Sequence, residues 1–300
     1  MKELINLLEK AEIDYIENEP MKNHTSFKTG GDAKVFISPK DENELIYVLK
    51  ICKSLSMKPF VLGNGSNLLI SDEGIKNRPV IHIGKAFSFI RDIDETTIEV
   101  GAGGSLTALC NYALSKELTG LEFAFGIPGS CGGAAYMNAG AYGGEMKDVM
   151  VTCNHIDSDG NKGSFSGDEL DLSYRHSVYS DSEYIITSII VRLSKGDKKE
   201  IEDKMQDLMG RRKDKQPLEY PSAGSVFKRP EGYFAGALIE QSGLKGKRIG
   251  GAMVSEKHAG FIINYDNATT SDVLELIRFC QDTVMEKFGV RMETEIKHIS

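Results

Sequence analysis

Apolar residues recur every three or four positions in several parts of the chain, a spacing that is typical of amphipathic helices. Near the N-terminus, Leu4, Leu7 and Leu8 stand among charged residues, which favours a surface helix over the unbroken apolar core of a signal peptide. A stronger pattern covers residues 41–56 and stops before Pro59, a residue that cannot continue a helix. Further helices are predicted from Ser105 onward, over residues 198–215 as a charged helix, and over residues 234–241 and 271–288.

Residue types at the ends of these patterns predict where the helices begin and end. Ser105 is suited to cap the start of its helix, and Gly120 is expected to end it. Thr270 or Ser271 is expected to cap the last long helix, which Gly289 would end.

Short apolar runs between the helices predict strands over residues 60–62, 68–70, 97–100, 184–193 and 260–265, with a short final strand. Asp157-Ser158-Asp159-Gly160 predicts a turn. Segments 170–172 and 292–296 are also strand-like. The mixture indicates an α+β protein with mixed sheets, and the charged helix at 198 suggests two domains, residues 1–197 and 198–300.

Composition excludes several functional classes. The 300 residues include 36 lysines and arginines against 44 acids, a net charge of −8 that argues against a general nucleic-acid-binding protein. No stretch approaches the roughly 18 apolar residues of a membrane-spanning helix, so we expect a cytoplasmic protein. The 5 cysteines form no C-x-x-C pair and the 6 histidines show no metal-ligand spacing, so neither disulfides nor a metal is expected. No obligate protein partner is evident.

The first glycine-rich segment, Gly63-Asn64-Gly65-Ser66-Asn67-Leu68, separates two predicted strands. Glycine lets backbone amides approach a ligand closely, and such amides can surround phosphate oxygens. A β-hairpin turn explains the Asn-Gly pair equally well.

A second segment spans residues 126–144 and interleaves glycines with Ile127, Pro128, Ser130 and two tyrosines. This composition differs from a plain Gly/Ser linker and favours ordered backbone around a large flat ligand. Neither segment is a Rossmann or Walker motif, so we expect a dinucleotide held by another architecture, with Ile127, Pro128, Gly129, Ser130 and Gly140 in contact.

Three further places could carry chemistry. Tyr174-Arg175 could orient a carboxylate, Ser225 stands in a small-residue loop beside Lys228, and Glu293 and Glu295 would share one face of a strand. The plainer explanations are a surface ion pair for Arg175, a turn position for Ser225 and solvent-exposed acids for Glu293 and Glu295. A basic cluster could bind a diphosphate or could simply be a solvated helix face; it comprises Arg211, Arg212, Lys213, Lys215 and Lys228.

The order of these motifs resembles that of the UDP-N-acetylenolpyruvoylglucosamine reductases, the MurB family of bacterial peptidoglycan synthesis. The resemblance runs from Asn23-His24-Thr25-Ser26-Phe27 through both glycine segments, Tyr174-Arg175 and Gly224–Lys228 to Glu293-Thr294-Glu295. It implies an FAD-binding domain of the vanillyl-alcohol-oxidase/PCMH type, made of two α+β subdomains, and a C-terminal α+β substrate-binding domain. It also implies that NADPH reduces the FAD, which then passes hydride to UDP-N-acetylglucosamine enolpyruvate.

Matching positions in the family imply catalytic roles for Arg175, Ser225 and Glu295. Hydride addition at C3 of the enolpyruvyl group leaves charge at C2, which Arg175 and Glu295 would stabilise. Ser225 would donate the proton to C2. The resemblance also implies substrate contacts for Tyr174, Arg212, Lys215 and Lys228.

The sequence departs from the longer form of the family. Too few residues separate Arg175 from the strand at Tyr184 to hold that form's substrate-clamping tyrosine loop, so the chain resembles the shorter subclass, with Tyr179 a possible substitute. Arg229 replaces an asparagine of the longer form. Two alternatives are another FAD-dependent oxidase or dehydrogenase of this fold and a non-catalytic nucleotide-sugar-binding flavoprotein.

Overall fold

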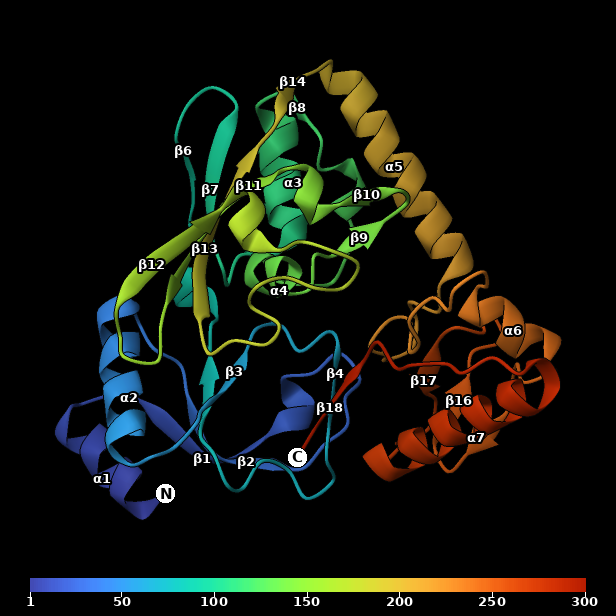
Figure 1. The fold of residues 1–300 in the computed structure, drawn as a ribbon, viewed down its shortest axis with the longest axis horizontal. Helices are drawn as coiled ribbons and strands as arrows, with labels where there is room; N and C mark the ends of the chain where they lie inside the picture. Colours follow the sequence, from blue (N-terminus) through green and yellow to red (C-terminus); the bar gives the residue numbers. More distant parts are fainter. The chain divides into compact units, whose positions relative to one another are not determined.

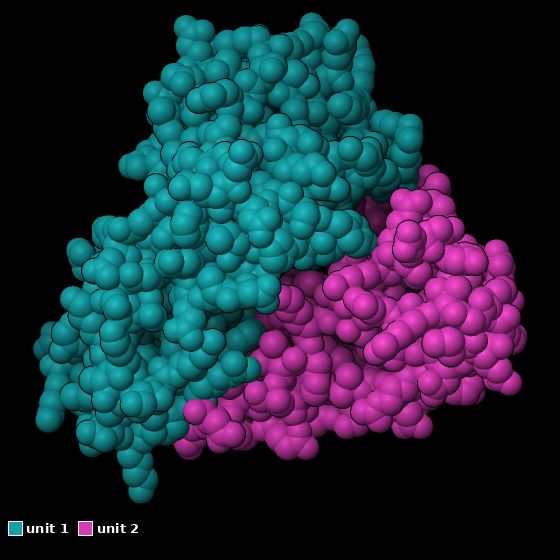
Figure 2. Space-filling model, viewed as in Figure 1, with its two compact units in different colours: residues 1–17, 35–64, 78–211 teal, residues 18–34, 65–77, 212–300 magenta.

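A computed structural model describes all 300 residues of the chain. The residues form two compact units, each assembled from separate stretches of sequence (Figure 2). Unit 1 contains residues 1–17, 35–64 and 78–211, and unit 2 contains residues 18–34, 65–77 and 212–300. These units are groups of residues in mutual contact, whereas the boundary expected at residue 198 separates two binding roles. That boundary therefore remains a prediction.

Near the N-terminus, two helices lie beside a four-stranded sheet. The helices are α1 (Lys2–Lys10) and α2 (Glu42–Ser54), and the strand order is β1 (Tyr15–Pro20), β2 (Asp32–Ile37), β5 (Val80–His82), β3 (Phe60–Leu62). Both β2 and β3 run parallel to β5. The side chain of Asp41 caps α2 by accepting from the amide of Glu44 at 2.8 Å. The predicted helix over residues 41–56 and strand over residues 60–62 are confirmed.

A five-stranded antiparallel sheet lies wholly within unit 1 (Figure 1). Its order is β12 (Lys162–Ser166), β11 (Met150–Ile156), β13 (Ile185–Arg192), β7 (Thr97–Gly101), β6 (Ile90–Asp92). Cys153, Ile189 and Val100 are register partners on three adjacent strands, and all three are fully buried. The predicted turn at residues 157–160 joins β11 to β12, with Gly160 at φ +84°.

Two further helices of unit 1 are α3 (Leu106–Ser115) and α4 (Cys131–Tyr136), and α4 packs against the five-stranded sheet. Ser105 caps α3 as predicted, because its Oγ accepts from the amide of Ala108 at 3.1 Å. The prediction that Gly120 ends this helix is wrong, since α3 ends at Ser115. Gly120 instead follows β8 (Leu118–Thr119), which pairs with β14 (Ser194–Lys195).

Short elements complete unit 1. A two-stranded hairpin lies within the second glycine segment, and 3₁₀ turns connect the longer elements. They are η2 (Lys85–Phe87), η3 (Glu122–Ala124), β9 (Gly140–Ala141), β10 (Gly144–Glu145), η4 (Met146–Asp148) and η5 (Gly167–Leu170).

Unit 2 has its own core, built around a three-stranded antiparallel sheet and two helices. The strands are β15 (Arg248–Ile249), β16 (Ala252–Val254) and β17 (Ile262–Asn264), and the helices are α6 (Ala235–Gln241) and α7 (Thr270–Phe288). The helix α5 (Lys198–Lys215), with its predicted bounds, precedes this part of the chain. No helix of the protein has both the length and the apolar character needed to cross a bilayer.

Residues 18–34 and 65–77 belong to unit 2 although they come early in the chain: the first contributes to its core and the second pairs with its last strand. Phe27, which follows η1 (Met21–Asn23), is fully buried among the C-terminal apolar side chains. Strand β4 (Leu68–Ile70) pairs in parallel with the final strand, β18 (Lys297–Ile299). Residues more than 200 positions apart in sequence therefore belong to one folded unit.

The prediction that Thr270 or Ser271 caps helix α7 is wrong, because the helix begins at Thr270 and its cap is the residue before it. Thr269 is the N-cap, and its Oγ accepts from the amide of Asp272 at 3.1 Å while the Asp272 side chain accepts from the amide of Thr269 at 3.0 Å. This capping box satisfies two amides that the helix itself cannot pair. Gly289 ends α7 at φ +66°, as predicted.

Candidate active site

The two predicted cofactor segments meet inside unit 1. Gly63 follows β3, and Ser130 caps α4 by accepting from the amide of Gly133 at 3.2 Å. A Cβ atom at Gly63 would lie only 2.6 Å from the Oγ of Ser130. The alternative of a hairpin turn at residues 63–67 is wrong, because β3 pairs with β5 whereas β4 pairs with β18.

A third glycine-rich turn, residues 101–104, belongs to the same region. The amide of Cys131 donates to the carbonyl oxygen of Gly104 at 2.7 Å, and the amide of Leu106 donates to that of Gly129 at 3.1 Å. From the sequence, residues 101–104 are only a turn before the helix predicted at Ser105, with no binding role. Its glycines, at the end of a buried strand, were the signal that could have added it to the predicted site.

The second glycine segment ends in a tight hairpin. Gly140 pairs with Glu145 across β9 and β10, and the two residues between the strands, Tyr142 and Gly143, have φ of +53° and +88°. Positive φ at both central residues is typical of the type I′ turn that suits a two-residue hairpin. A Cβ atom at Gly140 would lie 2.7 Å from the Cγ of Glu145, which explains the glycine at this position.

Tyr174 and Arg175 form a tight turn rather than the end of a strand. The backbone groups of Ser173 and His176 pair across it, with N···O distances of 3.2 and 3.1 Å. Arg175 has a φ of +57°, in the left-handed region that residues with a Cβ rarely occupy. The strand expected at residues 170–172 is wrong. Leu170 ends η5, and Asp171 also has positive φ, because a capping box at Ser166 and Glu169 stabilises a 3₁₀ turn there.

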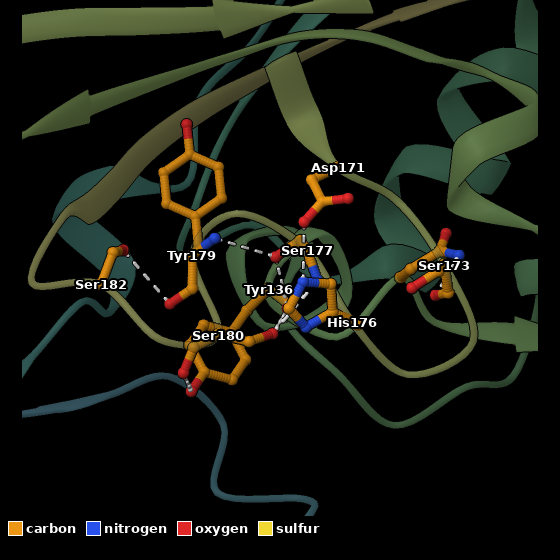
Figure 3. A network of polar contacts seen from close by, with 9 residues as sticks. Tyr136, Asp171, Ser173, His176, Ser177, Tyr179, Ser180 and Ser182 are labelled. Atoms are coloured by element: carbon orange, nitrogen blue, oxygen red, sulfur yellow. Dashed lines mark hydrogen bonds and ion pairs between the residues drawn. The ribbon is translucent and has the colours of Figure 1, made fainter. Parts of the chain in front are cut away.

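The loop that carries Arg175 is anchored to the C-terminal residue of α4 (Figure 3). The carbonyl oxygen of Tyr136 accepts from the Oγ atoms of Ser177 and Ser180 at 2.6 and 3.2 Å. In return, the Tyr136 hydroxyl donates to the carbonyl oxygen of Ser180 at 3.1 Å. The Arg175 turn and the glycine segment are thus parts of one hydrogen-bonded assembly.

In unit 2, two predicted catalytic residues flank the backbone of one residue, Val226. Its amide donates to the carbonyl oxygen of Gly260 at 2.9 Å, and its own carbonyl oxygen accepts from the amide of Glu295 at 2.7 Å. Ser225, directly before it, forms a β-bridge with Phe261. Ser225 and Glu295 therefore lie next to one another although 70 residues separate them in sequence.

The end of the first glycine segment reaches the same place in unit 2. The side-chain amide of Asn67 donates to the carbonyl oxygen of Glu295 at 3.1 Å, and the amide of Lys297 donates to that of Asn67 at 3.0 Å. Leu68 is the register partner of Lys297. Gly65 has a φ of +60° and approaches the His24 carbonyl oxygen closely. The motifs around residues 24, 65, 225 and 295 are consequently neighbours in space.

The strand predicted for residues 292–296 is wrong, and β18 begins only at Lys297. Within the segment, Met292 and Ile296 are buried and Thr294 forms a single bridge with Phe227. Strand alternation therefore cannot place Glu293 and Glu295 on one face. Glu293 lies on the surface, where its carboxylate is 3.4 Å from the Nζ of Lys228.

Comparisons with known proteins agree with this arrangement. Residues 33–162 match a family model for an FAD binding domain, and residues 216–299 match the model for the C-terminal domain of UDP-N-acetylenolpyruvoylglucosamine reductase. The reductase of that name from Caldanaerobacter subterraneus subsp. tengcongensis is 51% identical over 93% of this chain and 92% of its own. The one from Clostridium novyi is 48% identical over 99% of this chain and 95% of its own. The chain belongs to the UDP-N-acetylenolpyruvoylglucosamine reductase family.

A solved structure of the family confirms the predicted α+β fold class. The reductase from Thermus caldophilus has a TM-score of 0.81 and 35% identity, and the match covers 96% of this chain and 99% of that one. With its FAD-binding domain, the chain is an FAD-containing oxidoreductase of the reductase family.

The basic residues expected to contact the substrate of a family reductase do not form one solvated face. Arg212 is 6% exposed and its Nη1 donates to the Oε1 of Gln216 at 3.3 Å, whereas Lys215 is exposed. Arg211 is also exposed and pairs with Asp207 at 2.8 Å. Arg229 places its guanidinium 4.0 Å from the ring centre of Phe234. The substrate contacts predicted for Arg212, Lys215 and Lys228 stay predictions.

Tyr179 cannot replace the clamping tyrosine of the longer family members, because it is 1% exposed. Its hydroxyl donates to the carbonyl oxygen of Cys153 at 3.0 Å and lies 3.0 Å from the Nδ1 of His155. Burial raises the pKa of Tyr179 strongly. The rings of His155, Phe165 and Tyr184 pack against it, so Tyr179 anchors the loop to the sheet.

Proposed function

We propose that the chain catalyses the NADPH-dependent reduction of UDP-N-acetylglucosamine enolpyruvate to UDP-N-acetylmuramate through bound FAD. The observation that carries this proposal is the hydrogen bond from the Glu295 amide to the carbonyl oxygen of Val226, the residue after Ser225, which brings Glu295 close to Ser225 and next to Asn67. A proton donor and a charge-stabilising carboxyl group are what an enolpyruvyl reduction needs at one carbon atom. The relatives at about half identity carry the name of this reaction.

The residues of the glycine segments fit the cofactor. Gly63 packs so closely against Ser130 that a side chain would fill the space, and glycines leave backbone amides accessible to phosphate oxygens. Residues 63–68, Ile127, Pro128, Gly129, Ser130 and Gly140 would hold FAD. Bound FAD supplies the hydride, which NADPH provides to it.

The protein's own residues would stabilise charge and move one proton. Hydride addition at C3 of the enolpyruvyl group leaves negative charge at C2, delocalised into the carboxylate. The guanidinium of Arg175 would stabilise that charge, as would Glu295 in its protonated form. Ser225 would donate its hydroxyl proton to C2, because a carbanion beside a carboxylate is a much stronger base than an alkoxide. Tyr174, Arg212, Lys215 and Lys228 would orient the substrate.

We place the enzyme in the cytoplasm and in the shorter subclass of its family. All five cysteines are free and buried, which supports a reducing compartment. The short loop between Arg175 and β13, together with the burial of Tyr179, supports a subclass without the clamping tyrosine.

The test separates the two half-reactions. Anaerobic NADPH should bleach the flavin absorbance of the purified protein, and UDP-N-acetylglucosamine enolpyruvate should restore it. Bleaching without restoration would remove this substrate, and a protein that cannot be loaded with FAD would overturn the proposal.

Replacement of the proton donor tests the chemistry directly. Ser225→Ala should bleach with NADPH at the wild-type rate but recover about 10²- to 10⁴-fold more slowly, the usual range for loss of a general acid. Ser222→Ala, in the same segment, is the matched control and should recover normally. Wild-type recovery in Ser225→Ala would show that another group donates the proton.

A further inference from the structure

Arg175 is held in a backbone conformation that the residue does not favour. Its φ of +57° lies where glycine or asparagine is usual, and such conformations persist only when the surrounding structure enforces them. The turn hydrogen bonds between Ser173 and His176 fix its two ends. The guanidinium lies 5.2 Å from the ring centre of Tyr174, so the position of this backbone turn determines where the Arg175 charge can lie.

Asn138 connects this turn to the glycine hairpin. It is fully buried, and its Nδ2 donates to the carbonyl oxygen of Ser173 and to the Oε2 of Glu145, both at 2.9 Å. Its Oδ1 accepts from the amide of Lys147 at 2.9 Å. One amide group thus uses both protons and its oxygen to join two segments 35 residues apart.

Glu145 brings a negative charge to the same place. Its carboxylate accepts from Asn138 and lies 3.0 Å from the Nζ of Lys147. The hydrogen bond from Lys147 lowers the pKa of Glu145, and the charge of Arg175 contributes in the same direction. The carboxylate therefore stays ionised at neutral pH, and Asn138 links it to the backbone of the turn that carries the arginine.

We propose that Asn138 and Glu145 are positioning residues for Arg175. Asn138 fixes the carbonyl oxygen of Ser173, the first residue of the turn, and Glu145 orients the guanidinium by its charge. Neither touches the reacting atoms. The inference rests on the proposed function, in which Arg175 stabilises the charge that develops at C2.

The test compares two replacements of Glu145. Glu145→Gln keeps the length of the side chain and an oxygen that accepts from Asn138, but it loses the charge. Glu145→Asp keeps the charge and shortens the side chain. A purely structural role predicts that Gln is tolerated better than Asp, whereas an electrostatic positioning role predicts the opposite order.

The two half-reactions give the readout. Bleaching by NADPH should stay within about twofold of wild type in both variants, since it does not need the C2 charge to be stabilised. Restoration by the substrate should fall about 10- to 100-fold in Glu145→Gln, the effect of a misplaced catalytic group, and less in Glu145→Asp. Asn138→Asp, which removes both donated hydrogen bonds, should show the same selective loss.

A control separates the effect of the Glu145 charge on Arg175 from the ion pair that Glu145 makes with Lys147. Lys147→Met removes the lysine partner of Glu145. In this variant the substrate should restore the flavin absorbance at the wild-type rate. An equal loss in Lys147→Met and Glu145→Gln would overturn the inference, and so would wild-type restoration in Glu145→Gln. A wild-type protein that this substrate does not reoxidise would overturn the proposed function and this inference together.

Discussion

Gly65 allows a direct test of how tightly the first glycine segment packs. The residue has a φ of +60°, and a Cβ atom there would lie 2.1 Å from the carbonyl oxygen of His24 and 3.1 Å from the Cα of Thr25. Both neighbours are backbone atoms that cannot rotate away. Gly143 is the matched control, because it has a φ of +88° but a Cβ atom there would meet nothing within 4 Å.

The two substitutions should differ in cost by the steric contribution alone. Alanine in the left-handed region costs about 1–2 kcal/mol, and this applies to Gly65→Ala and Gly143→Ala alike. Forcing a methyl group into a packed site adds about 1–3 kcal/mol, and this applies only to Gly65→Ala. We therefore expect losses of about 2–5 kcal/mol in Gly65→Ala and about 1–2 kcal/mol in Gly143→Ala.

Urea denaturation at saturating FAD measures both free energies of unfolding, since ligand binding contributes to apparent stability and has to be held constant. Flavin content after gel filtration provides a second measurement. Gly65→Ala should retain less FAD than wild type, because the segment expected to contact the cofactor must move. Equal losses of stability in the two variants would refute the steric argument and leave only the backbone conformation.

Two other predictions concern single side chains. Tyr179→Phe should lower the stability by about 1–2 kcal/mol through its lost hydrogen bonds but leave the KM for the substrate unchanged; a raised KM would restore this tyrosine as a clamp. Burial raises the pKa of Asp72, but hydrogen bonds from Ser271 and Thr270 outweigh it and lower the pKa below the usual 3.8. The stability that Asp72 contributes is thus fully present above about pH 4 and is lost as the pH falls through the lowered pKa. The melting temperature of Asp72→Asn should therefore depend less on pH in this range than that of wild type.

Much of the fold could be predicted because local signals and tertiary packing agree. The α2 and α7 helices have polar caps, regular apolar spacing and a residue that stops them, and tertiary contacts reinforce each signal. The predictions of a helix end at Gly120 and of a strand at residues 292–296 are wrong for a physical reason. A glycine after a helix and an alternating sequence are compatible with several structures, and only the surrounding chain selects among them.

The candidate site could be predicted as a set of segments but not as an arrangement. The resemblance identified Ser225, Glu295 and Arg175 without indicating what holds them. The link from Asn67 to the Glu295 backbone and that from Asn138 to Ser173 join residues 228 and 35 positions apart. No local pattern encodes such pairs, and each depends on a side chain that looks like an ordinary loop asparagine in the sequence.

The scattered origin of unit 2 has a consequence for how the chain folds during synthesis. Residues 18–34 leave the ribosome early, but apart from Leu69 the buried side chains that share the core with Phe27 begin at Ala223. At about 5–20 residues per second, the early segment must wait roughly 10–40 s before those partners exist. Phe27 is exposed throughout that interval, so a chaperone that binds apolar segments has its longest opportunity there. A fragment made of residues 212–300 alone would lack Phe27 and the partner strand of β18. The apolar side chains that contact Phe27 and the edge of β18 would then stay exposed permanently.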